Sequence, residues 1–234
     1  MFARAAFITA IVLALGGGGA RAQSAIPQRD AQQVIAAVER FVDAINAGDR
    51  VAIVNSISAV ETSPRQREQR DIIASLIEAE KKLEREAQQR WGTDGSRLRC
   101  RFDVAFNEED RKALRRAQVL IDDSAARVVV DGETSAMRVR RNAKGQWQVV
   151  IDIVDFEPDS DQPIQSWMES RSRIRRDRYR GYVDAVNSTL AKTQGGEFAT
   201  AVAAEADLAD RFAKISAEMA QRSNALNSSP FPFR

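Results

Sequence analysis

ARVVVDGETSAMRVRRNAKGQWQVVIDI, residues 126–153, alternates apolar and polar side chains around two glycine-containing turns. This period of two is typical of strands that have one buried face. Asp131-Gly132 predicts a two-residue hairpin turn. NAKGQ, residues 142–146, predicts a three-residue loop with Gly145 in the left-handed conformation. The stretch therefore predicts an antiparallel meander of three strands.

The two turns also predict which residues lie opposite each other. In the first hairpin Val128 faces Ser135, and in the second Val139 faces Val149. Both registers, chosen from turn chemistry alone, collect the apolar side chains on one face, which a slip of one residue would scramble. The predicted apolar face consists of Ala126, Val128, Val130, Met137, Val139, Trp147, Val149, Ile151 and Ile153. The predicted polar face consists of Arg127, Thr134, Arg138, Arg140, Gln148 and Asp152.

The residues before the meander predict helices. A helix from Asp30 ends at Gly48, and Asp49 is placed to cap a short helix over residues 51–57. The apolar stripe of the first helix consists of Val34, Val38, Phe41, Val42 and Ile45. Each of these segments is amphipathic, so we expect the helices to cover the apolar face of the sheet.

A longer helix is predicted to begin at Pro64, after Ser63, and to run to Trp91 before Gly92. Its apolar stripe consists of Ile72, Leu76, Ala79, Leu83 and Ala87. The other positions are rich in charged and amide side chains, which predicts one buried face and one solvated face.

Residues 98–106 alternate as a further strand, with Cys100 in the core-facing row, and residues 108–118 predict a short charged helix. Cys100 is interpreted as a small buried apolar residue. Residues 23–156 together predict an α+β domain in which N-terminal helices pack on an antiparallel sheet meander, in a cone-like arrangement.

EPDSDQP, residues 157–163, is typical of a linker. Two long helices follow, over residues 164–192 and residues 196–223, and we expect them to pair as a helical hairpin. The hairpin folds back either on the domain or on a partner chain. The tail, residues 224–234, is predicted to be disordered.

Residues 1–22 have the three parts of a secretory signal peptide. Arg4 precedes an apolar run from Ala5 to Leu15, and Ala20-Arg21-Ala22 resembles a cleavage site. We therefore expect a periplasmic or secreted protein with no transmembrane segment after cleavage. Arg4 and Arg21 would be lost with the signal peptide, which leaves 33 of the 35 basic residues against 33 acidic residues. This balance, together with export, argues against a nucleic-acid partner.

The composition excludes several kinds of chemistry. The chain has no histidine and one cysteine. The commonest metal ligand and general base at neutral pH is therefore missing, and no intramolecular disulfide is possible. We expect neither a metal nor a cofactor.

Six arginines lie between Arg171 and Arg180, against one acid, Asp177. At 100° per residue, one side of the helix carries Arg171, Arg175 and Arg178, and the opposite side carries Arg173, Arg176 and Arg180. One interpretation is a solvated helix with two charged flanks. The other is a contact with an anionic partner: lipid headgroups, a phosphorylated glycan or an acidic protein. The candidate ligand or anion contacts are Arg171, Arg175, Arg178, Trp167 and Tyr182.

FVDAINAGDRVAIVNSI, residues 41–57, resembles the opening of the nuclear-transport-factor-like superfamily, the cystatin-like α+β cone shared with ketosteroid isomerase. The strand, tight turn, strand and Gly-x-Trp-x-Val order at residues 126–153 is similar as well. The helix that ends in Arg-Trp-Gly resembles secreted bacterial cone proteins of uncharacterised function. The resemblance covers residues 30–155 and implies a cone with an internal pocket. The carboxylate and the His or Tyr of the cone enzymes have no counterpart that matches here.

The hypothesis that follows is an exported, non-catalytic binding or protein-interaction module, in which a protein partner or a homo-oligomer is possible. The alternatives are a cone enzyme of the isomerase or cyclase type and a carrier of a small apolar ligand. Asp152 is the best candidate for a general base, but the predicted register puts it beside Arg127 and Arg138. Neighbouring arginines stabilise a carboxylate in its charged form, which favours a surface ion cluster over a base.

Overall fold

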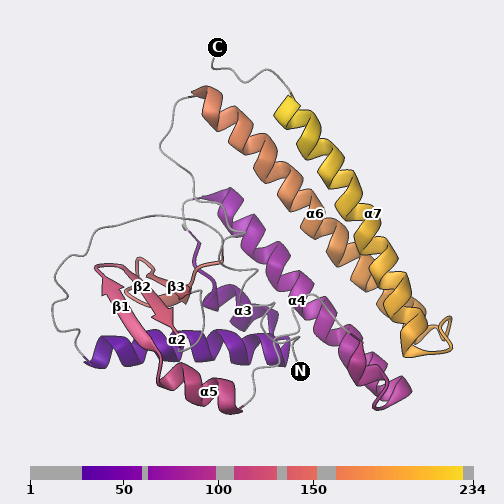
Figure 1. The fold of residues 1–234 in the computed structure, drawn as a ribbon, viewed down its shortest axis with the longest axis horizontal. Coiled ribbons are helices and arrows are strands. Elements are labelled where there is room, and N and C mark those ends of the chain that lie inside the picture. The colour runs from indigo at the N-terminus through magenta and orange to yellow at the C-terminus, as the bar shows by residue number, and fades with distance from the viewer. Residues whose placement is uncertain (1–27, 60–62, 99–107, 131–135, 152–161, 229–234) are drawn as a thin grey trace. The chain divides into compact units, whose positions relative to one another are not determined.

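The computed structural model describes residues 28–59, 63–98, 108–130, 136–151 and 162–228. These residues form an α+β structure with six α-helices and a four-stranded antiparallel sheet (Figure 1). The chain divides into two compact units, Met1–Arg67 with Val104–Val154 and Glu68–Asp103 with Asp155–Arg234. Among the described helices, none combines the length and the apolar run that a membrane span requires.

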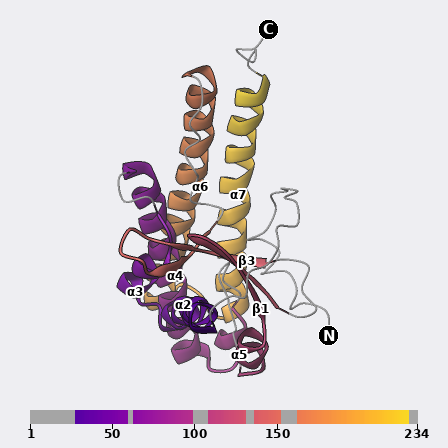
Figure 2. The ribbon, with the colours of Figure 1, turned by 90° about the vertical axis from the view of Figure 1, so that its left-hand side faces the viewer.

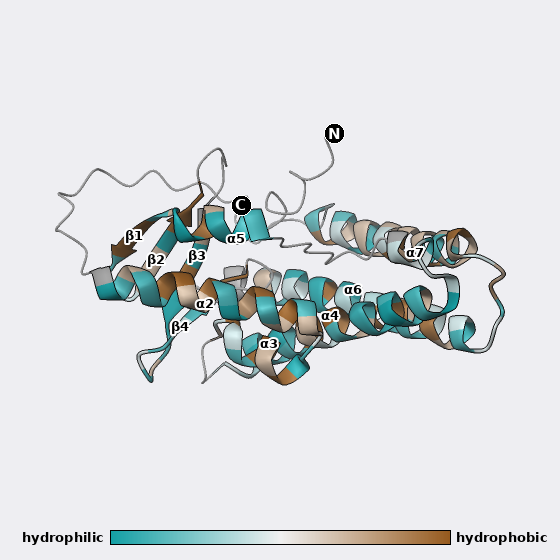
Figure 3. Ribbon diagram, turned by 90° about the horizontal axis from the view of Figure 1, so that it is seen from below, coloured by the Kyte–Doolittle hydropathy of each residue, from teal (hydrophilic) through white to brown (hydrophobic). Residues whose placement is uncertain are grey.

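In the first unit, helix α2 (Gln28–Ala47) contacts all four strands of the sheet. Hydrophobic and hydrophilic residues alternate around it (Figure 3), and Figure 2 views the helix nearly along its axis. The predicted apolar stripe is confirmed, because its five members are all buried: Val34, Val38, Phe41, Val42 and Ile45. The helix begins two residues before Asp30, which therefore lies inside its first turn.

The break after α2 follows from two adjacent residues. Gly48 adopts φ 61°, and its N–H donates to the Ile45 carbonyl at 2.9 Å while the Asp49 N–H donates to the Ala44 carbonyl at 3.1 Å. This pair of bonds satisfies the last carbonyls of the helix. The Asp49 carboxylate then accepts from the Ala52 N–H at 3.0 Å and caps α3 (Arg50–Ser56). The predicted end and the predicted cap are both confirmed.

The sheet has the order β1-β2-β3-β4, with strands Gln118–Asp122, Ala125–Val129, Ala136–Arg141 and Trp147–Val149. The second predicted hairpin is confirmed, since Val139 pairs with Val149 and Gly145 has φ 76°. Within its loop the Asn142 Oδ1 accepts from the N–H groups of Lys144 and Gln146, at 2.9 and 3.0 Å. The apolar face is buried as predicted at Ala126, Val128, Val139, Trp147, Val149 and Ile151.

The predicted register of the first hairpin is wrong by two residues. Val128 pairs with Met137, where the turn chemistry of Asp131-Gly132 had placed Ser135. A shift of two keeps every side chain on its own face, because side chains alternate with period two. The apolar pattern therefore could not distinguish the two registers.

Strand β1 was not predicted, and it makes the sheet one strand larger than the expected meander. Helix α5 (Glu108–Arg115) ends before the predicted residue 118, and β1 follows it directly. Asp122 pairs with Ala125 across a tight turn in which Asp123 has φ 48°. β1 lies at the edge of the sheet and has no fully buried residue, so it lacks the clean alternation that marks a strand in sequence.

In the second unit, three long helices pack together: α4 (Pro64–Trp91), α6 (Gln162–Gln194) and α7 (Ala201–Ser228). Helix α4 belongs to this unit from Glu68 onward, and its first turn belongs to the first unit. Glu68 contacts Arg176 and Glu86 contacts Gln194, so α4 and α6 run in the same direction. Asp177 contacts Arg222 and Lys192 contacts Asp207, so α7 runs the opposite way beside α6 (Figures 1 and 2). The shared core consists of Leu76, Ala79, Leu83, Ala87, Leu98, Tyr182, Ala185, Val186, Ala204 and Leu208.

The ends of these helices correct several predicted bounds. α4 begins and ends as predicted: the Ser63 hydroxyl accepts from the Gln66 N–H at 3.3 Å, and Gly92 has φ 59° after Trp91. A 3-10 turn, η1 (Gly95–Arg97), follows it. α7 begins at Ala201, later than predicted, because the Thr200 hydroxyl caps it by accepting from the Ala203 N–H at 3.2 Å. It continues to Ser228, into the segment that was predicted to be a tail.

Several sequence-based predictions concern residues outside the described ranges. These are the signal peptide over residues 1–22, the turn at Asp131-Gly132 and the larger part of the linker, residues 157–163. The assignments of Cys100 and Asp152 also lie there.

Candidate functional site

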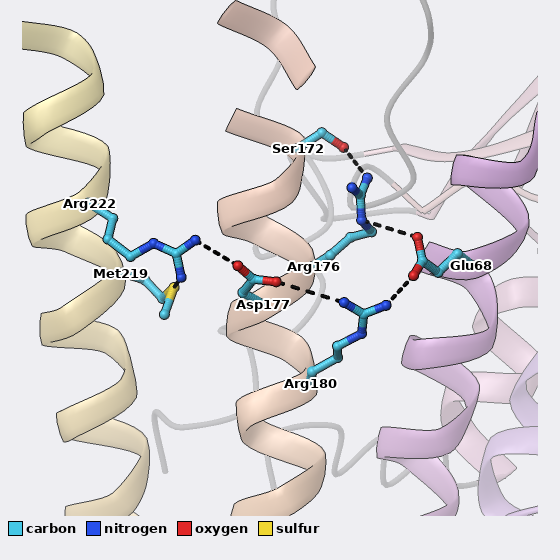
Figure 4. A network of polar contacts seen from close by, with 7 residues as sticks. All are labelled: Glu68, Ser172, Arg176, Asp177, Arg180, Met219 and Arg222. Atoms are coloured by element: carbon cyan, nitrogen blue, oxygen red, sulfur yellow. Dashed lines mark hydrogen bonds and ion pairs between the residues drawn. The ribbon is translucent and has the colours of Figure 1, made fainter. Parts of the chain in front are cut away.

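Arginines of α6 make an ion-pair network with α4, shown in Figure 4. The Arg176 Nε lies 3.2 Å from the Glu68 Oε2, and the Arg180 guanidinium bonds the other oxygen of the same carboxylate. The Arg176 Nη1 also donates to the Ser172 hydroxyl at 3.1 Å. Only 15% of the Arg176 side chain is exposed. One interpretation made this flank of α6 solvated; instead α4 lies against Arg176 and Arg180 and neutralises them, while Arg173 on the same flank is exposed.

Asp177 extends the network to α7. Its carboxylate accepts from the Arg222 Nη2 at 2.6 Å and lies 3.8 Å from the Arg180 Nη1 (Figure 4). The carboxylates of Glu68 and Asp177 thus join three helices, and together they face three guanidinium groups. Sequence analysis missed this network because its acids come from positions far apart in the chain.

Arg171, Arg175 and Arg178, which we call the α6 row, lie on the other side of α6. The Arg171 guanidinium carbon is 5.2 Å from the centroid of the Trp167 ring, so the two predicted contact residues are brought together. Arg178 is half-buried, and within the described residues its Nε has no hydrogen-bond partner. Among those residues no carboxylate forms an ion pair with Arg171 or Arg178, whereas Arg175 has a polar or electrostatic partner. Arg171 and Arg178 therefore keep positive charge that no carboxylate of the described residues neutralises.

Tyr182 lies in the hydrophobic core and not on the surface with this row. Its side chain is 1% exposed, packs on Phe212 with a centroid separation of 4.7 Å, and shares a hydrogen bond of 2.8 Å with the Ser216 hydroxyl. It contributes to the core of the second unit, so we remove it from the set of surface contacts. The helical spacing that placed it near the arginines also places it on the apolar stripe with Val186.

A second polar cluster joins α6 and α7 around Asp207. Its carboxylate accepts from Thr189 at 3.0 Å, Lys192 at 3.0 Å and Arg211 at 2.8 Å. Burial alone raises the pKa of Asp207, but these three hydrogen bonds outweigh burial and lower the pKa to about 2. The group is locked in its charged form, which suits a structural role and not proton transfer at neutral pH.

One buried acid escaped sequence analysis. Glu80 is 1% exposed and has a polar or electrostatic partner. It had been assigned to the solvated face of α4. The spacing of Ile73, Ile77 and Glu80, which puts them on one side of the helix, was the signal that could have indicated burial.

Within the described part of the chain, no group of three or more Cys, Asp or Glu side chains is arranged to hold a metal ion. The other two tryptophans pack within the fold. Trp147 is buried, and the Arg141 guanidinium carbon lies 4.6 Å from the centroid of its ring. Trp91 packs on the core of the second unit. Comparison of the chain with protein-family models, with curated proteins and with solved structures finds no match.

Proposed function

We propose that this protein is an exported, non-catalytic binding module that recognises an anionic partner through the α6 row. The proposal includes a cone-like packing of the first unit and a stable helical hairpin of α6 and α7 that presents the row. Export rests on the signal-like sequence of residues 1–22. Sequencing the N-terminus of the protein from its own host tests this part, and a start near Gln23 is expected.

The observation that carries the proposal is the contrast between the two sides of α6. On one side, two of the three arginines, Arg176 and Arg180, are matched by Glu68, and Arg173 is exposed. On the other, Arg171 and Arg178 have no carboxylate among the described residues. Arginine is weakly hydrated for a cation and presents a planar set of donors, so an unmatched pair on a rigid helix is suited to binding anions.

The charge state of the acids supports a non-catalytic role. A general base at neutral pH needs a carboxylate whose pKa is raised, and Asp207 has the opposite shift. Glu68 and Asp177 are engaged by arginines. The alternatives, a cone enzyme or a carrier of an apolar ligand, have no observation of their own among the described residues.

Cation-exchange chromatography tests whether the row concentrates positive charge. We expect R171Q/R178Q to elute at lower salt than the wild type. R116Q/R127Q is the matched control, because it removes the same net charge from two exposed arginines of the first unit. If both double variants elute at the same salt concentration, the row does not concentrate positive charge and the proposed function fails.

A further inference from the structure

We infer that a second copy of this chain binds along the outer edge of strand β1, so that two sheets join through antiparallel pairing of their β1 strands. The inference goes beyond the proposed function and does not depend on it. β1 is the outermost strand of the sheet (Figure 1). Among the described residues, no backbone hydrogen bond outside its ladder with β2 involves residues 118–122. The open edge of a sheet is a template for another strand.

The opposite edge of the sheet is closed by the chain itself. Ile57 forms a bridge with Val149 of β4, and the Ser58 N–H donates to the Val149 carbonyl at 2.8 Å. Beside them, the Gln148 side chain donates to the Asn55 carbonyl at 2.8 Å. The segment at the end of α3 therefore covers β4, and within the described ranges β1 is the edge that stays open to a partner.

The tight turn between β1 and β2 determines which backbone groups of β1 point outward. Asp122 and Ala125 flank the two-residue turn, and a pair in this position exchanges hydrogen bonds across the hairpin. Because hydrogen-bonded and non-hydrogen-bonded pairs alternate along the ladder, the N–H and C=O groups of Val119 and Ile121 point away from β2. These groups are the ones that a partner strand would bind.

The apolar side chains of β1 are incompletely covered. Val119, Leu120 and Ile121 are all half-buried, although Val119 lies opposite the buried Val128 of β2. A strand placed alongside β1 would cover their remaining exposed sides. Natural sheets commonly carry a charge or a proline within an edge strand to discourage pairing, and the centre of β1 has neither.

The charges at the two ends of β1 select a second copy in the antiparallel orientation. Arg116 precedes the strand, and Asp122 and Asp123 lie at and just after its end. All three are exposed; Arg116 bonds the Lys112 carbonyl, and among the described residues none of the three has a partner of opposite charge. Pairing centred on Val119 places Arg116 of each copy opposite Asp122 of the other. Parallel pairing would set like charges side by side, so β1 is complementary to itself in one orientation only.

Sedimentation velocity over a concentration series, with the protein as its host processes it, tests the inference. We expect a reversible equilibrium between one and two chains, because pairing of two short strands buries less surface than a permanent interface does. Val119→Pro removes an outward N–H and spares the ladder with β2, so it should give a monomer with the circular dichroism of the wild type. A wild type that stays monomeric up to about 1 mM, because another segment of the same chain covers the edge, overturns the inference. A dimer that Val119→Pro leaves intact also overturns it.

A charge exchange tests the pairing without changing the backbone. R116E and D122R each place like charges at both ends of the paired strands and should weaken the dimer at least about tenfold. An equimolar mixture of the two variants restores opposite charges at both ends, so a mixed dimer of about wild-type affinity should form. K144E makes the same change of charge as R116E in the exposed loop between β3 and β4, and it should dimerise as the wild type does.

Two results of the charge exchange overturn the inference: a mixture that stays monomeric, and a K144E dimer as weak as that of R116E. Neither result bears on the proposed function, which the elution of R171Q/R178Q tests separately.

Discussion

Replacement of Asp207 by asparagine tests whether a single charge holds α6 and α7 together. Thr189 and Lys192 of α6 and Arg211 of α7 all donate to this carboxylate. Asp207→Asn keeps the size of the side chain and one acceptor oxygen, but it removes the negative charge. Thr189 is fully buried, so its hydroxyl stays near the replaced group in the folded protein.

The expected loss in the free energy of unfolding follows from the pKa of Asp207. Burial raises the pKa of Asp207, and the three hydrogen bonds lower it further than burial raises it, from 3.8 to about 2. Each pKa unit corresponds to about 1.4 kcal/mol, so the shift corresponds to about 2.5 kcal/mol of folded-state stability. One fifth of the side chain is exposed, and water screens part of this interaction. We therefore expect Asp207→Asn to lower the free energy of unfolding by about 2 kcal/mol at pH 7.

The same shift predicts a pH dependence. Because the pKa is lower in the folded chain than in the unfolded one, the contribution is fully present above about pH 4 and is lost as the pH falls through about 2. Urea unfolding followed by circular dichroism measures the difference between wild type and variant at each pH. We expect the difference to shrink towards zero between pH 4 and pH 2.

Asp210→Asn is the matched control on the same helix. Asp210 pairs with Lys214, but these side chains are 61% and 76% exposed, and such pairs contribute roughly 0.3–0.5 kcal/mol. Two results would refute the reasoning. One is an Asp207→Asn variant as stable as Asp210→Asn at pH 7, and the other is a difference that stays constant down to pH 2.

Three further substitutions test the packing, a turn and a cap. Leu208→Ala removes a core side chain that is 2% exposed and should cost about 2–5 kcal/mol in urea unfolding; if it costs no more than Val202→Ala, where Val202 is 73% exposed, the assigned core is wrong. Gly145→Ala forces φ 76° on a residue with a Cβ and should lower stability by about 1 kcal/mol, seen as a lower Tm, whereas an unchanged Tm contradicts the turn. Asp49→Ala removes the cap of α3 and should cost about 1 kcal/mol, while Asp49→Asn should stay near wild type; equal losses would show that capping is not the cause.

Features that depend on neighbouring residues were predicted correctly from sequence. Gly48 and Asp49 end one helix and start the next, because the left-handed glycine and the capping carboxylate act within four residues. The loop around Gly145 set the register of β3 and β4 for the same reason. The α+β class and the apolar face of the sheet followed from periodicity, which is a local property of the chain.

Features that depend on distant residues were decided only by the tertiary structure. The pairing of β2 with β3 moved by two residues because period-two alternation allows registers that differ by an even number. Glu68 forms ion pairs with Arg176 and Arg180 because α4 packs along that side of α6. No local sequence pattern indicates which flank of a charged helix will contact another helix. The composition and spacing of α6 thus determined on which side of the helix each arginine lies, but packing against α4 and α7 decided which of them are neutralised.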